Sequence, residues 1–123
     1  MAPIARLSTI ALDCRDPQAL AEFYSQLTGW EIGPLDDDWI ELSSDGAVTI
    51  AFQLAPDHQP PEWPSAGRPQ QAHLDFDVDD LDVGEAATVA LGARKADVQP
   101  GETFRVFIDP AGHPFCLCLA GSE

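Results

Sequence analysis

The sequence contains very few basic residues and no long hydrophobic segment. Its 123 residues include 6 Lys+Arg against 21 Asp+Glu, which gives a formal net charge of −15. A field of this sign repels phosphate backbones and anionic headgroups, so we expect neither a nucleic acid nor a membrane as a partner. No apolar run of about 20 residues could span a bilayer, and the N-terminus lacks the apolar stretch of about 7–15 residues typical of signal peptides. These absences predict a cytoplasmic protein.

Cysteine is also scarce. The three cysteines, Cys14, Cys116 and Cys118, are an odd number and lie in apolar, strand-like runs. This pattern favours reduced, buried thiols over a disulfide framework. The sequence has no glycine-rich phosphate-binding loop, no hydrolase nucleophile elbow, no C-x-x-C and no H-E-x-x-H motif. A functional site, if it is to form, must therefore be built from residues that are distant in the sequence and that the fold brings together.

What the sequence does contain is an internal repeat with a constant shift of 64 residues. The matched pairs are Thr9 with His73, Asp13 with Asp77, Asp16 with Asp80, and Leu27 with Leu91. In each copy an alternating strand ends at an aspartate that can cap a helix, and a glycine follows the helix. We expect the second helix to pack through Val83, Ala86, Ala87 and Ala90.

Two further strands follow each copy of this unit. They are predicted over residues 39–43 and 47–54, joined by a turn at 44–46, and over 103–109 and 114–119. The chain is thus read as one α+β domain, residues 1–123, made of two tandem βαβββ modules at about 5–54 and 72–120. Residues 55–71 carry five of the eleven prolines and form a crossover. Its Trp63 is expected either to cover the edge of a pocket or to pack against its own loop.

Period-2 alternation assigns the strand residues to two faces, one packed on the helices and one free to line a cavity. The residues expected on the cavity side are Thr9, Trp39, Glu41, Gln53, His73, Asp75, Arg105, Phe107 and Cys116. Acidic residues crowd the segment that follows His73, which disfavours anionic ligands.

Three segments carry a family resemblance: DCRDPQALAEFYSQLTGWEI, PQQAHLDFDVDDLD and DPAGHPFCLC. With them the chain resembles the vicinal oxygen chelate superfamily of glyoxalases, bleomycin resistance proteins and extradiol dioxygenases. It looks closest to the glyoxalase-like domain of short bacterial proteins. The resemblance implies that the two modules form a curved mixed sheet around a cavity, with the helices on the outside. It also implies a homodimer.

The resemblance further implies where a metal would bind. Metal-dependent members take ligands from four strand positions, which fall here on Thr9, Gln53, His73 and Cys116. His73 alone matches the usual ligand pattern, because threonine and glutamine are poor ligands and a cysteine replaces the usual carboxylate. We therefore expect no cofactor, and a divalent metal held by His73 and Cys116 is the alternative.

The favoured interpretation is a protein that binds a small organic molecule, neutral or cationic, without the usual metal site. An alternative is an enzyme of lyase, isomerase or dioxygenase type that uses His73 as a catalytic base or metal ligand. Conventional glyoxalase I activity is not expected in either case. A third reading is a non-catalytic interaction module.

Overall fold

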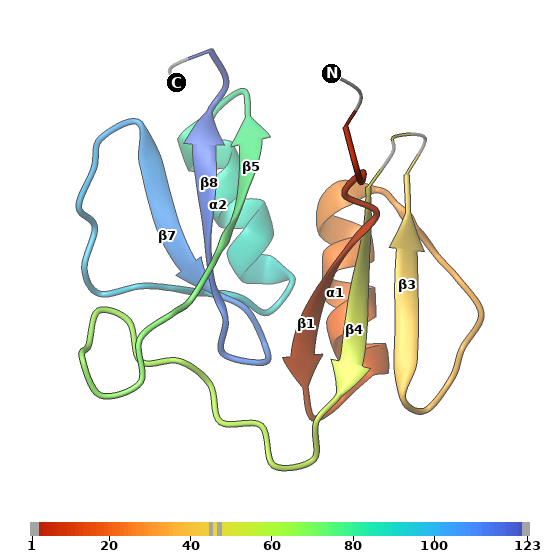
Figure 1. The fold of residues 1–123 in the computed structure, drawn as a ribbon. Helices are drawn as coiled ribbons and strands as arrows, with labels where there is room; N and C mark the ends of the chain where they lie inside the picture. The colour runs from red at the N-terminus through yellow and green to blue at the C-terminus, as the bar shows by residue number, and fades with distance from the viewer. Residues whose placement is uncertain (1–2, 45, 47, 122–123) are drawn as a thin grey trace. The chain divides into compact units, whose positions relative to one another are not determined.

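Each copy of the repeat folds into a four-stranded mixed sheet with one helix on one of its faces (Figure 1). The structure is a computed structural model, and it describes residues 3–44, 46 and 48–121. The chain divides into two compact units, Met1–His58 and Gln59–Glu123, which we treat separately. In each unit, the sheet face opposite the helix is called the open face below.

The first unit contains the first βαβββ module. Its elements are β1 (Thr9–Cys14), α1 (Pro17–Thr28), β2 (Glu31–Ile32), β3 (Trp39–Ser43) and β4 (Thr49–Leu54). The strand order is β1-β4-β3-β2, in which β1 and β4 run parallel and the other pairs are antiparallel. Asp45, in the turn expected at 44–46, lies outside the described residues.

The second unit repeats this arrangement. Its elements are β5 (Leu74–Val78), α2 (Leu81–Ala90), β6 (Arg94–Lys95), β7 (Phe104–Ile108) and β8 (Pro114–Leu119). The order is β5-β8-β7-β6, again with one parallel pair, β5 with β8. The α+β class and the two tandem βαβββ modules are confirmed. No helix in the described part of the chain is both long and apolar enough to cross a membrane.

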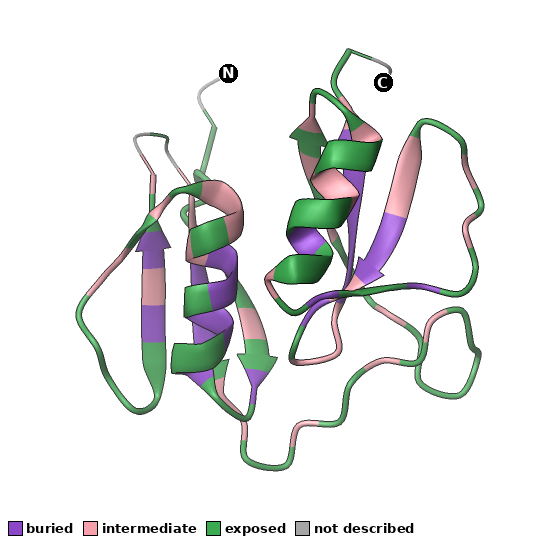
Figure 2. Ribbon diagram, turned by 180° about the vertical axis from the view of Figure 1, so that it is seen from behind, coloured by how far each residue is buried: buried purple, intermediate pink, exposed green. Residues whose placement is uncertain are grey.

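Helix α1 forms where the local signals predict it. The Asp16 side chain accepts a hydrogen bond from the Ala19 amide at 3.1 Å, which satisfies one of the unpaired donors of the first turn. The helix ends at Gly29, whose φ of 76° suits a residue without a Cβ. Its inner side is buried on the first sheet (Figure 2), and the Tyr24 ring stacks on Phe52 at 5.7 Å.

Helix α2 is capped by Asp80 as expected, but the expected packing stripe is wrong. Val83 is 68% exposed, and Ala86, Ala87 and Ala90 are exposed as well. The helix instead meets the sheet through Gly84 and Thr88, and a Cβ on Gly84 would lie 3.1 Å from the Val78 side chain. The alanines of α2 carry too little apolar surface to decide which side of the helix is buried. The glycine, which has no side chain, instead permits the helix to approach the sheet closely.

The face expected for β7 is also wrong, and the correction concerns Arg105 and Phe107. The Arg105 guanidinium donates to Asp82 at 2.9 Å and to Glu85 at 3.0 Å, both on α2. The Phe107 ring is fully buried and stacks on Phe115 at 5.7 Å. Both residues therefore lie on the helix side of the sheet. The aliphatic stem of arginine can cross apolar surface and deliver its charge to carboxylates on the helix.

Candidate functional site

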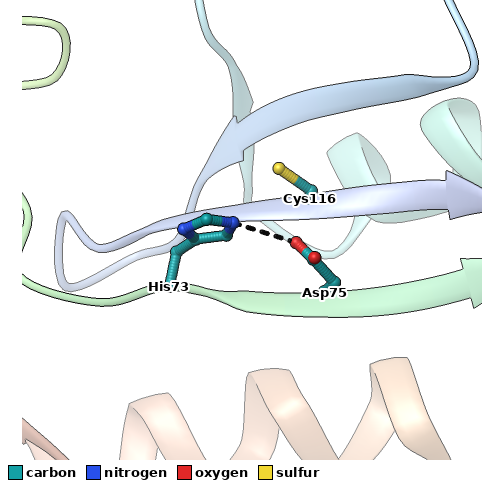
Figure 3. Close-up of side chains that lie close together, drawn as sticks. All are labelled: His73, Asp75 and Cys116. Carbon is teal, nitrogen blue, oxygen red and sulfur yellow. Dashed lines mark ion pairs between the residues drawn. The ribbon is translucent and has the colours of Figure 1, made fainter. Parts of the chain in front are cut away.

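The second unit gathers three chemically capable side chains on its open face. Strands β5 and β8 pair in parallel with Asp75 directly opposite Cys116. His73 precedes β5 by one residue, and its spacing of two from Asp75 puts both on the same face. Figure 3 shows the three side chains projecting from these neighbouring segments toward one another. We call His73, Asp75 and Cys116 the β5–β8 cluster.

The geometry of this cluster is close. His73 Nε2 lies 3.1 Å from Asp75 Oδ1, and one ligand atom from each of the three residues lies within 4.8 Å of the others. The side chains of His73 and Asp75 are 40% and 48% exposed, whereas Cys116 is only 7% exposed. The thiol thus lies at the base of the site, beneath a histidine–carboxylate pair that solvent can reach.

The surroundings of Cys116 hold its thiol in the protonated form. Burial raises the pKa of Cys116 to about 12, with further contributions from the charge of Asp75, from Cys118 and from a hydrogen bond with Asp75. A thiol acts as a nucleophile through its thiolate, so this environment opposes covalent catalysis by Cys116. Its available roles are hydrogen bonding, apolar packing and, after loss of the proton, metal binding.

A cavity of about 360 Å³ opens beside the cluster and is lined entirely by the second unit. The lining residues are Trp63, Gln70, His73, Asp75, Pro100, Thr103, Phe104, Val106, Pro114, Cys116 and Cys118. Most of them offer apolar surface. Gln70 Oε1 is buried and has no hydrogen-bond partner among the described residues. A buried acceptor of this kind costs free energy until a donor meets it.

The structure brings together some of the expected site residues and places others elsewhere. His73, Asp75 and Cys116 line the cavity. In the first unit, Trp39 Nε1 donates to Glu41 at 2.9 Å on the open face of the first sheet. Arg105 and Phe107 lie on the helix side of the second sheet, as described above.

Thr9 and Gln53, also on the open face of the first sheet, do not meet within it. Thr9 pairs with Thr49, and their hydroxyl oxygens are 2.9 Å apart. Gln53 lies four residues further along β4, or about 13 Å away at the rise of a strand. These two residues therefore do not form a compact pair.

The strand registers also correct the expected equivalence between the two modules. The matched pairs are Ala11–Ala51 with Asp75–Cys116, and Asp13–Gln53 with Asp77–Cys118. Cys116 therefore corresponds to Ala51, and Gln53 corresponds to Cys118. The first module has alanines where the second has a carboxylate and a thiol. A shift of 64 fits the first strands, but the last strands are related by 65.

Sequence patterns did not predict several of the residues that line the cavity. Phe104 and Val106 line the cavity because they alternate with Arg105 and Phe107 along β7. Gln70 and Pro100 lie in segments without regular periodicity, so no pattern could place them. Thr103 begins the strand expected over 103–109 but lies just before β7 in the structure. Trp63 lies at the cavity, one of the two positions considered for it.

Two sets of side chains could in principle supply ligands to a divalent metal. Thr9, Gln53, His73 and Cys116, the four positions that the family resemblance implies, do not fit a metal site, since two of them are weak neutral ligands and Gln53 is not the counterpart of Cys116. The β5–β8 cluster does offer three protein donors, one nitrogen, one oxygen and one sulfur, which is the number found in open zinc sites.

Tandem βαβββ modules, each with its helix on one side of a mixed sheet, define the vicinal oxygen chelate superfamily, and this chain is a member of it. Within the superfamily it belongs to the glyoxalase-like domain family, which matches residues 9–118. A search of curated proteins found no match.

Solved structures with the same fold come from several bacteria. A glyoxalase/bleomycin resistance protein/dioxygenase family enzyme from Burkholderia phytofirmans PsJN is 20% identical, with a TM-score of 0.71 over 92% of this chain and 97% of that one. The glyoxalase family protein from Enterococcus faecalis is 20% identical, with a TM-score of 0.68 over 94% and 98%. Lactoylglutathione lyase from Agrobacterium tumefaciens is 18% identical, with a TM-score of 0.64 over 97% and 96%. At these identities the likeness establishes the fold and not the activity.

Proposed function

We propose that this protein binds a small organic molecule, neutral or cationic, in the cavity of its second unit, without the four-ligand metal site of its metal-dependent relatives. The observation that carries the proposal is the cavity itself. Its volume of about 360 Å³ falls within the range of roughly 300–1,000 Å³ typical of small-molecule sites. Its composition, largely apolar with a few polar groups, is also typical of such sites.

The polar groups at the cavity favour a ligand that donates hydrogen bonds. Gln70 Oε1 is an acceptor whose partner would come from the ligand, and the Asp75 carboxylate supplies negative charge to the same cavity. Trp63 and Phe104 offer aromatic surface on which a flat apolar body can pack. Together with the net charge of −15, these groups disfavour an anion.

Three indole compounds with the same ring test this preference: tryptamine, which is cationic, tryptophol, which is neutral, and indole-3-propionate, which is anionic. Binding to the metal-free protein is followed by calorimetry and by the indole N–H signal of Trp63 in NMR spectra. We expect saturable binding of tryptamine and tryptophol, and weaker binding of the propionate. The proposal fails if none of the three binds, or if the propionate binds most tightly.

A pair of tryptophan substitutions tests the location. Thr103 lines the cavity and is exposed, so Thr103→Trp narrows the cavity without disturbing the core. Val98 is 46% exposed and does not line the cavity, which makes Val98→Trp the matched control. We expect only Thr103→Trp to weaken indole binding. Equal effects of the two substitutions would place the site elsewhere.

The contact between His73 and Asp75 favours a second candidate, an enzyme of lyase, isomerase or dioxygenase type. A carboxylate 3.1 Å from an imidazole nitrogen can fix the ring and support its action as a general base. Deuterium incorporation into hydroxyacetone in D₂O, followed by NMR, tests for proton abstraction next to a carbonyl. Catalysed exchange that is lost in His73→Gln and kept in His113→Gln would favour the enzyme.

We also propose that the protein is a cytoplasmic homodimer. The three free, buried cysteines suit a reducing compartment. Each sheet ends in strands that pair on one side only within that sheet, and such edges can be covered by a second copy. Light scattering after size exclusion should give twice the 13.2 kDa of the chain. A mass equal to that of one chain contradicts the homodimer.

A further inference from the structure

We propose that Gln99 is the positioning residue of the cavity: its side-chain amide fastens the segment 96–104 to β7 and thereby fixes the aromatic wall on which a ligand packs. The proposal rests on the ligand-binding function proposed above. It adds to that function a residue that does not itself line the cavity and that acts through Phe104, which does.

The Gln99 side chain takes the place of a backbone bond between two strands. Strand β6 ends at Lys95, and the next amide, that of Ala96, still donates to the Val106 carbonyl at 3.0 Å. In a regular antiparallel pair the Val106 amide would donate back to the Ala96 carbonyl. Instead it donates to Gln99 Oε1 at 2.8 Å, and Gln99 Nε2 donates to the Ala96 carbonyl at 2.9 Å.

The same Nε2 atom also donates to the Val106 carbonyl at 2.9 Å, so the half-buried amide of Gln99 makes three hydrogen bonds. Two of them use both polar groups of Val106, whose side chain lines the cavity. A glutamine amide can do this because it carries an acceptor and two donors in one plane, like the peptide group that it replaces. Gln99 is therefore held to β7 at the point where the chain leaves the sheet.

The wall of the cavity follows directly from this point. Pro100 and Thr103 line the cavity, and Phe104 begins β7. Gly101 packs so closely on the Phe104 ring that a Cβ at this position would collide with it. A movement of this segment therefore moves the ring, and the Gln99 hydrogen bonds restrict that movement.

Two substitutions remove the bonds in different ways. Gln99→Met keeps a side chain of similar length and loses all three hydrogen bonds. Gln99→Glu keeps the shape but loses both donors, and its carboxylate faces the carbonyl oxygens of Ala96 and Val106. Gln59→Glu is the matched control, because it makes the same change of charge at an exposed residue outside the cavity lining.

Calorimetry measures the affinity of the full-length, metal-free proteins for tryptophol. We expect both Gln99 variants to bind about tenfold more weakly than wild type at neutral pH, which corresponds to a correctly placed wall in about one molecule in ten. Gln59→Glu should bind like the wild type. Circular dichroism and urea unfolding establish that each variant is folded under the conditions of the titration.

A pH profile separates positioning from a general loosening of the fold. Protonation of the new carboxyl in Gln99→Glu restores a donor, and the two carbonyl dipoles raise the pKa of this group above its ordinary value of about 4.3. The affinity of Gln99→Glu should thus approach that of wild type as the pH is lowered toward about 5, whereas Gln99→Met should not recover. His73, Asp75 and Asp97 are present in every variant, so the ratio of each affinity to that of wild type removes their contribution.

The inference is overturned if the Gln99 variants bind tryptophol as tightly as Gln59→Glu, or if Gln99→Glu does not recover on acidification. Should Gln99→Glu fail to fold, the affinity of Gln99→Met decides.

Failure of the wild type to bind tryptophol is a different result, because it refutes the ligand-binding function. The positioning role is then decided by amide hydrogen exchange. Gln99→Met should speed exchange about tenfold at Val106 and across residues 101–104, and rates equal to those of wild type overturn the role.

Discussion

Replacing Phe107 with alanine tests the orientation of β7, on which the composition of the cavity depends. The Phe107 side chain is 0% exposed and its ring stacks on Phe115, which in turn makes an edge-to-face contact with Phe76 at 5.9 Å. Removing a buried phenylalanine leaves a cavity and costs about 3–5 kcal/mol. A typical domain has a free energy of unfolding of about 5–15 kcal/mol, so a large share of the stability is lost.

Phe104→Ala is the control on the opposite face of the same strand. Phe104 is half-buried and lines the cavity. Its removal should cost a smaller amount, about 1–2 kcal/mol, and should weaken tryptophol binding because the ring loses a packing surface. Urea unfolding followed by circular dichroism measures the stabilities, and calorimetry measures binding.

The two variants should thus show opposite patterns. Phe107→Ala loses stability, and in the fraction that stays folded the affinity for tryptophol is close to that of the wild type. Phe104→Ala keeps most of its stability and binds less well. If Phe107→Ala costs less than about 1 kcal/mol and abolishes binding, β7 has the reverse orientation, and Phe107 lines the cavity in place of Phe104.

Three further predictions concern the cap of α2, its ion pairs and the buried thiol. Asp80→Ala should lower the free energy of unfolding by about 1 kcal/mol in urea titrations, because two amide donors lose their acceptor; an unchanged midpoint refutes the capping role. Lys95 lowers the pKa of Glu85 below its ordinary value of 4.5, and Arg105 lowers it further. The ion pairs of Glu85 therefore stabilise the fold fully above pH 4.5. This stabilisation is lost as the pH falls through the lowered pKa of the folded protein. Glu85→Gln should therefore destabilise the protein at pH 7, with a difference from wild type that shrinks on acidification; a constant difference contradicts the ion pairs. The pKa of Cys116 is raised from 9.0 to about 12, so at pH 8 the folded, metal-free protein should react with iodoacetamide at Cys116 roughly a thousandfold more slowly than the protein in denaturant. Peptide mass spectrometry measures both rates, and equal rates contradict the burial of the thiol.

Local signals were sufficient to predict the helices and most strands. Asp16, Pro17 and Gly29 each act within one turn of α1, so the bounds of this helix follow from neighbouring residues. In β5, large apolar residues alternate with aspartates, and this contrast identifies the two faces without knowledge of the partner strand. The chain therefore encodes its two modules through interactions that are short in sequence.

The remaining features depend on contacts between distant segments. In β7, both faces carry a phenylalanine, and only the carboxylates of α2 determine on which side Arg105 lies. Similarly, Asp75 and Cys116 were both expected on the cavity side. Their position directly opposite each other depends on the register in which β5 pairs with β8. A strand sequence does not specify the register of its partner, and a shift of one residue would separate them.

The two modules differ in how much a substitution at their matched strand positions can remove. Ala11 and Ala51 correspond to Asp75 and Cys116 but carry only a methyl group. We therefore expect a harmful change at these positions of the first unit to act mainly by lowering stability, a loss for which a stabilising background can compensate. We expect a harmful change in the second unit to be able also to remove a polar side chain of the β5–β8 cluster from the cavity, which no gain in stability restores.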